Sequence, residues 1–118
     1  MALATSIQLL PQTSFNVHNP IQIGETKLAA GYYTNSCCNG QTVSWHVTGL
    51  VGTVTVQASL LKEPTETDWF DLFTITGGTI EAPLTEAKFK NIDGNFVTMR
   101  AKVTDFIQGV VQNVKVTY

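Results

Sequence analysis

Charged side chains are scarce in this sequence of 118 residues. Asp, Glu, Lys and Arg together make up 14% of the chain, and the formal net charge is −2, whereas an average domain is about 25% charged. Seven basic residues scattered through a slightly acidic chain do not build the positive surface that nucleic acids require, so we expect no nucleic-acid partner. Hydrophobic residues still make up 43% of the chain, which argues against disorder.

Long apolar runs and cofactor motifs are absent as well. No stretch of about 18 apolar residues occurs, so we expect no membrane-spanning helix. Residues 1–12 lack a cationic segment followed by a long apolar one, and we expect no secretory signal there. Phosphate-binding loops and dinucleotide fingerprints are missing. We therefore expect neither a membrane partner nor a cofactor.

Cysteine is limited to the adjacent pair Cys37 and Cys38. Neighbouring cysteines form only a strained ring with each other, so we interpret them as reduced thiols of a protein made in a cytoplasm. The alternative is a metal site that combines the pair with His46 or His18. Zinc ligands are usually spaced as Cys-x(2–4)-Cys, and this spacing is absent, so we expect no metal.

The abundant residues favour β structure. Thr, Val and Ile occupy 36 of the 118 positions, and their branched side chains pack well on a pleated sheet. Glycines at short intervals mark expected turns or strand ends: Gly24, Gly31, Gly40, Gly49, Gly52, Gly77-Gly78, Gly94 and Gly109. The segments between them predict eight strands: Ser6–Leu10, Ile21–Ile23, Gln41–Val47, Gly52–Leu60, Trp69–Thr76, Thr79–Leu84, Asn95–Val103 and Val110–Tyr118. Trp69–Thr76 and Thr79–Leu84 are expected to form a hairpin across Gly77-Gly78.

Alternation within the strands predicts which side chains face the core, because successive side chains point to opposite faces. In Gln41–Val47 the odd-numbered residues share one face, and the even-numbered residues share the other. The other expected inward residues are Val54, Val56, Ala58 and Leu60; Val97, Met99, Ala101 and Val103; and Val110, Val114, Val116 and Tyr118. The expected solvent-facing residues are Thr53, Thr55, Gln57 and Ser59, together with Thr98, Arg100 and Lys102.

Helix signals are weak throughout. The best candidate, Pro83–Asn91, predicts one helical turn at most. Eight strands at this spacing predict one all-β domain over residues 1–118, an antiparallel β-sandwich of the jelly-roll or Ig-like kind. Residues 1–30 have a looser pattern with two prolines, Pro11 and Pro20. They predict edge strands of the sandwich, and the alternative is an N-terminal arm that contacts a neighbouring subunit.

Catalytic constellations are largely missing. Ser44 and His46 share a strand face, but a Ser–His nucleophile also needs an orienting acid and an oxyanion hole, and neither can be placed in the sequence. We therefore expect a solvated strand there and no enzyme.

Residues 62–71 gather four carboxylates, from Glu63, Glu66, Asp68 and Asp71. Such a cluster suits calcium or an acid/base pair across a glycosidic bond. The spacing of a calcium loop is missing, and the favoured interpretation is a connecting loop.

Four aromatic residues are candidates for an interaction platform: Tyr32, Tyr33, Trp69 and Phe70. An apolar ring face packs on a pyranose, so an exposed pair of rings would indicate sugar binding. Buried rings would indicate core or interface packing instead.

Several segments, taken in order, resemble a known family. They are Ala30–Tyr33, Gln41–Trp45, Gly52–Leu60, Pro64–Phe70, Gly94–Val103 and the closing residues 109–118. Together, over about residues 30–118, the chain resembles small all-β virion structural modules of tailed bacteriophages, especially the myoviruses of marine cyanobacteria. The resemblance implies a virion component without catalysis that is assembled in the host cytoplasm, and it defines no functional residues.

Three functions follow as hypotheses. The first is a structural protein, either a capsid decoration (cement) protein or an accessory head, neck or tail protein. It would be a homo-oligomer that binds the major capsid protein or tail and neck components. The second is a tail-fibre or baseplate adhesin that binds a host-surface glycan. The third is a glycosidase that uses two of the four clustered carboxylates.

Overall fold

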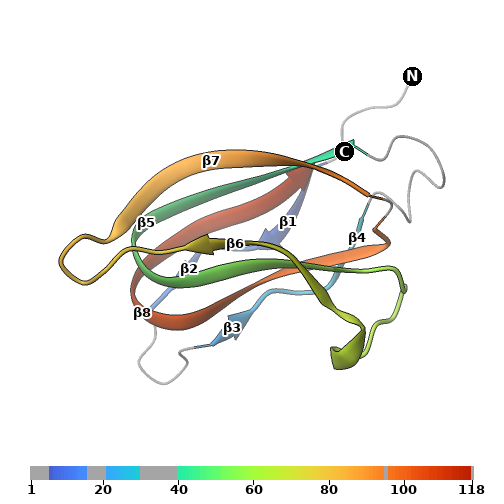
Figure 1. Cartoon of the computed structure of the whole chain (residues 1–118), viewed down its shortest axis with the longest axis horizontal. Coiled ribbons are helices and arrows are strands. Elements are labelled where there is room, and N and C mark those ends of the chain that lie inside the picture. The colour runs from blue at the N-terminus through green and yellow to red at the C-terminus, as the bar shows by residue number, and fades with distance from the viewer. Residues whose placement is uncertain (1–5, 16–20, 30–39, 95, 118) are drawn as a thin grey trace.

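The computed structural model describes residues 6–15, 21–29, 40–94 and 96–117. Its strands are β1 (Ser6–Leu10), β2 (Thr13–Ser14), β3 (Gln22–Ile23), β4 (Lys27–Leu28), β5 (Gly40–Ser59), β6 (Phe70–Thr76), β7 (Leu84–Asp93) and β8 (Thr98–Thr117). A 3₁₀ helix, η1 (Glu66–Asp68), precedes β6. All eight strands join one antiparallel sheet (Figure 1), so the all-β prediction is confirmed. Among the described residues, no helix has the length and apolar character needed to cross a bilayer.

Two strands of 20 residues each, β5 and β8, organise the sheet. They pair with each other along most of their length, and both curve back at the same end of the molecule (Figure 1). The first half of β5 pairs with β7 and the second half of β8, which β1 and β2 extend; we call this the first layer. The second half of β5 pairs with β6 and the first half of β8, which β3 and β4 extend; this is the second layer.

The apolar core lies between the two layers, as expected of a β-sandwich. The Trp45 ring of the first layer lies 5.5 Å, centroid to centroid, from the Phe73 ring of the second. The fully buried residues of this core include Leu9, Val43, Val47, Leu50, Val54, Val56, Met99, Val103, Phe106, Val111, Val114 and Val116.

Glycines inside β5 and β8 make the bends, whereas the sequence predicts strand ends at these positions. Gly109 has a φ of +100° and Gly49 a φ of +61°, a region that glycine enters without steric cost. A Cβ on Gly109 would lie 2.3 Å from the Gly49 carbonyl oxygen, so the two bends are in direct backbone contact. The expected separate strands on either side of each bend are therefore single bent strands.

The predicted hairpin across Gly77-Gly78 is wrong. β6 pairs with the second half of β5 and β7 with the first half, so the chain crosses between layers here. The Gly77 N–H donates to the Gly52 carbonyl at 2.7 Å, and the Gly78 N–H to the Leu50 carbonyl at 3.0 Å. A Cβ on Gly77 would lie 2.5 Å from the Gly52 carbonyl oxygen, so this glycine permits close approach to the β5 bend.

The expectation for residues 79–91 is also wrong. Thr79–Leu84 is not a strand, and Pro83–Asn91 contains no helical turn, because Leu84–Asp93 forms the ten-residue strand β7. Most of its residues are exposed, so its sequence shows little apolar alternation. Pairing with β5, from Gly40↔Asp93 to Leu50↔Leu84, imposes the strand conformation.

Most expected core faces are confirmed. Gln41, Val43, Trp45 and Val47 are all buried, as are Val54, Val56, Ala58, Met99, Ala101 and Val103. Leu60 was expected inside but is 62% exposed, because β5 ends at Ser59. Val110 was also expected inside, but its neighbour Val111 is the one that is fully buried. The reason is that the pairing of β8 with β5 shifts register between His46 and Val47. Tyr118 lies outside the described residues.

The described part of residues 1–30 forms edge strands, as predicted. β1 spans Ser6–Leu10, and all four strands β1 to β4 pair with β8.

Candidate functional site

The outer face of the second layer is covered, whereas its polar residues were expected to face solvent. Thr55 is 5% exposed, Gln57 6% and Arg100 6%, and Ser59 and Thr98 are fully buried. The expectation is wrong because strand alternation specifies only the face of the sheet on which a side chain lies. Whether another segment covers that face depends on tertiary structure.

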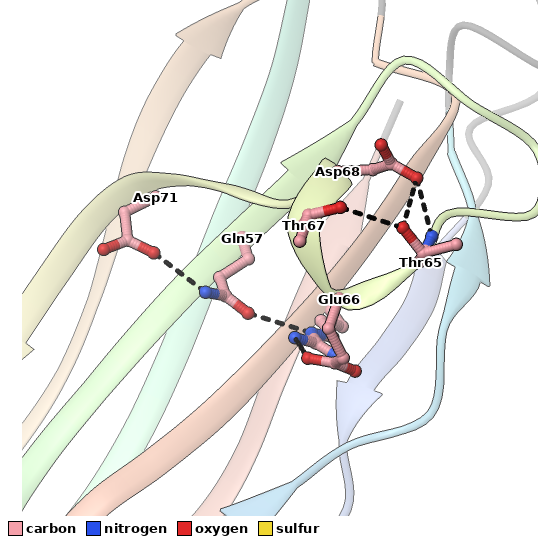
Figure 2. A network of polar contacts seen from close by, with 7 residues as sticks. Gln57, Thr65, Glu66, Thr67, Asp68 and Asp71 are labelled. Atoms are coloured by element: carbon pink, nitrogen blue, oxygen red, sulfur yellow. Dashed lines mark hydrogen bonds and ion pairs between the residues drawn. The ribbon is translucent and has the colours of Figure 1, made fainter.

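A row of polar side chains crosses three strands on this covered face. Arg100 on β8 pairs with Gln57 on β5, which pairs with Asp71 on β6. The Arg100 Nε donates to Gln57 Oε1 at 2.8 Å, and Gln57 Nε2 donates to Asp71 Oδ1 at 2.9 Å (Figure 2). From η1, Glu66 accepts bonds from both terminal nitrogens of Arg100, at 3.1 and 3.0 Å. We call Gln57, Glu66, Trp69, Asp71 and Arg100 the Arg100 cluster.

Further hydrogen bonds shape residues 60–69 and attach them to the sheet. The Asp68 carboxylate accepts bonds from the Thr65 N–H at 2.7 Å and from the Thr65 hydroxyl at 2.9 Å (Figure 2). The Thr98 hydroxyl donates to the Leu61 carbonyl at 2.9 Å. The connection is thus attached to the sheet near its start through Leu61 and at its turn through the contacts of Glu66 and Trp69 with Arg100.

The electrostatics of the cluster favour an ionised Glu66. Its hydrogen bonds with Arg100, followed by the charge of that guanidinium and then that of Lys102, lower the pKa of Glu66, and desolvation opposes them. The Arg100 side chain is 7% exposed and that of Glu66 is 79% exposed. Gln57 and Glu66 accept hydrogen bonds along the edge of the Arg100 guanidinium. The centroid of the Trp69 ring lies 4.3 Å from the guanidinium carbon, and the ring covers one face of the group. Arg100 is therefore a structural group rather than an anion site.

The predicted aromatic platform is not assembled among the described residues. Trp69 is half-buried and contacts Arg100 on the outer face of the second layer. Phe70 is 40% exposed, pairs with Ala58 on the core face, and packs its ring 5.7 Å from Phe96. The two neighbouring rings thus lie on opposite faces. Tyr32 and Tyr33 lie outside the described residues.

The four clustered carboxylates have different hydrogen-bond partners. Glu66, Asp68 and Asp71 bind Arg100, Thr65 and Gln57 respectively, and Glu63 is exposed. These contacts lend no support to an acid/base pair. Within the described ranges, no group of three His, Cys, Asp or Glu residues could hold a metal ion. His18, Cys37 and Cys38 lie outside those ranges.

The outer face of the first layer is open and mostly polar. Pairing places Ser44 between Phe89 of β7 and Lys115 of β8, and His46 between Ala87 and Asn113. Phe89 is 66% exposed. A shallow hollow of about 310 Å³ lies here, lined by Ser44, Trp45, His46, Ala87, Lys88, Phe89 and Asn113. We call the outward residues Thr42, Ser44, His46, Phe89, Asn91, Asn113 and Lys115 the open face.

Sequence reasoning missed both features for identifiable reasons. Strand alternation places Arg100 and Gln57 on an outer face and does not show whether that face is covered. The signal of a cover was Trp69, a large aromatic residue in the loop that follows β5. Phe89 was missed because its segment was expected to be a helical turn at most. The available signal was the single aromatic residue Phe89 between Lys88 and Lys90.

Comparison with known proteins supplies no family, since no family model matches the chain and no curated protein matches it significantly.

Proposed function

We propose that this protein is a non-enzymatic structural protein of a tailed-bacteriophage virion. In this role it binds other virion proteins as a capsid decoration or as an accessory head or tail surface protein, and it forms a homo-oligomer. The proposal starts from the ordered segments that resemble phage virion modules.

One structural observation carries the proposal: three of those segments meet in the Arg100 cluster. Gln57 comes from Gly52–Leu60, Glu66 and Trp69 come from Pro64–Phe70, and Arg100 comes from Gly94–Val103. Segments far apart in the sequence therefore form one contact that holds a loop on a sheet. The segments that carry the resemblance thus include the contacts that position this loop, which supports shared architecture as the basis of the resemblance.

Exposed apolar side chains at the end of the second layer support binding to other proteins. Leu60 is 62% exposed and Leu61 50%, and both directly follow β5 at the end where Phe70 begins β6. Leu60 and Leu61 are adjacent, and contiguous exposed apolar surface is a common feature of protein contacts.

The test is the copy number of this chain in purified virions, measured by quantitative mass spectrometry against the major capsid protein. Copies on the order of hundreds are expected for a lattice decoration, and a few to a few dozen for a neck, tail or baseplate position. Absence from virions would overturn the proposal. As a matched pair, Leu61→Asp should reduce incorporation and Ile107→Asp should not, since both residues are 50% exposed but Ile107 lies in β8.

A further inference from the structure

The open face differs from the covered face in what its polar groups contact. On the second layer, Gln57 and Arg100 use their hydrogen-bonding groups within the chain. On the open face, Thr42 donates to the Asn91 side-chain oxygen at 2.8 Å. Ser44, His46 and Asn113 have no side-chain hydrogen-bond partner among the residues that the structure describes. The open face therefore presents unused donors and acceptors around an exposed ring.

Charge on this face is low. Lys115 is the one charged residue of the open face, whose other members carry amide, hydroxyl, imidazole or aromatic groups. Lys88, which pairs with Trp45, also lines the hollow. Two lysines are too few to form the basic cluster that binds a nucleic acid. The surface suits a neutral ligand that forms many hydrogen bonds.

The face is also a poor match to a contact between copies of this chain. The buried centre of a protein–protein interface is mainly apolar, at roughly 65% of its area. Phe89 is the single large apolar side chain of the open face. Strand addition at β7 is disfavoured too, because Glu86 and Lys90 lie on the core side of this edge strand, and inward charges block edge pairing. Glu86 accepts a bond from the Trp45 indole at 2.9 Å, and Lys90 lies 5.2 Å from the Phe73 ring.

We infer that the open face is a glycan-binding site centred on Phe89. The apolar face of a pyranose would lie on the exposed ring, and its hydroxyl groups would bond to Ser44, His46 and Asn113. The hollow of about 310 Å³ is at the lower end of ligand-site volumes, which run from roughly 300 to 1,000 Å³, and matches one or two sugar units of a longer chain. This inference does not depend on the virion assignment, and its residues differ from the aromatic platform expected from the sequence.

The experiment is a titration of the isotope-labelled full chain, followed by amide NMR. Glucose, galactose, mannose, N-acetylglucosamine, maltose and cellobiose are added separately to high millimolar concentration. At least one should shift the signals of residues 42–48 and 87–91 and the side-chain amide of Asn113. Phe89→Ala should weaken that binding on the order of tenfold. The matched control is Ile80→Ala, since Ile80 is 65% exposed but lies outside the open face.

Each other outcome overturns the inference. No shift on this face with any of the six sugars would exclude it, as would shifts confined to the surroundings of Trp69 and Phe70. Equal affinity of the Phe89→Ala variant would show that the ring is not the platform. If the protein self-associates in sedimentation and Phe89→Ala abolishes this without any sugar binding, the face is a contact between copies. Because Phe89 is mostly exposed, the variant should fold, and its spectrum reports that directly.

Discussion

Replacing Arg100 by Met tests whether the Arg100 cluster holds residues 60–69 on the sheet. The substitution keeps an unbranched side chain of similar length and removes the guanidinium. It thereby removes the bond to Gln57 Oε1, the paired bonds to Glu66 and the stacking on Trp69. Glu66 is mostly exposed and can turn to water, so the expected loss comes from the buried side of the cluster.

The magnitude follows from two buried contacts. Gln57 is 6% exposed, and leaving its oxygen without a donor costs about 1–3 kcal/mol. Loss of the Arg–Trp contact costs roughly 0.5–2 kcal/mol, part of which a sulfur–aromatic contact from Met replaces. We expect Arg100→Met to lower the free energy of unfolding by about 2 kcal/mol, out of a total of roughly 5–15 kcal/mol. In urea the unfolding midpoint should fall on the order of 1 M.

A double-mutant cycle separates this reasoning from a general packing defect. Gln57→Leu in the Arg100→Met background removes the unpaired acceptor, so it should recover about 1 kcal/mol or more relative to the sum of the single changes. Lys102→Met is the control, two residues further on the same face and only partly buried, and should cost less than about 0.5 kcal/mol. A loss below about 0.5 kcal/mol for Arg100→Met, or strict additivity in the cycle, would refute the reasoning.

Two further predictions concern pH and the bends. Because Arg100 lowers the pKa of Glu66 below its ordinary value of 4.5, ionised Glu66 stabilises the fold above that value and loses this effect as pH falls through the lowered pKa. The urea midpoint of unfolding should thus differ between wild type and Glu66→Gln by a constant amount near neutral pH, and this difference should shrink below about pH 5. A difference that stays constant down to about pH 3 would contradict the prediction. Gly109→Ala combines a φ of +100° with a Cβ placed 2.3 Å from the Gly49 carbonyl oxygen. It should cost more than about 2 kcal/mol and lower the Tm by on the order of 10 °C. Gly40→Ala, with nothing within 4 Å of the new Cβ, should change the Tm by no more than a few degrees, and equal Tm values for the two variants would disprove the bend argument.

The two functional proposals use different parts of the surface. The exposed leucines at the end of the second layer are candidates for contact with virion proteins, and the open face is the candidate for a glycan. A negative result in the virion incorporation experiment therefore does not affect the glycan proposal. A negative result in the sugar titration likewise does not affect the virion proposal.

Local patterning determined the strands and their core faces where apolar and polar residues alternate. In β5 the buried residues Val43, Trp45 and Val47 follow from alternation alone, because the spacing of side chains along a strand has a period of two. The edge strand Ser6–Leu10 was likewise predictable with its bounds.

Tertiary structure decided everything that depends on contact between distant segments. Glycine in the sequence signals a change of direction but does not distinguish a strand end from a bend within a strand. In the structure, Gly49 and Gly109 lie inside the continuous strands β5 and β8, whose bends contact each other. A mostly exposed segment becomes β7 because β5 supplies hydrogen-bonding partners. Finally, Arg100 and Phe89 both lie on outer sheet faces, yet Arg100 is buried and Phe89 exposed, because the 60–69 connection covers one layer and not the other. Sequence periodicity specifies the face on which a side chain lies, and the path of the remaining chain decides whether that face meets solvent.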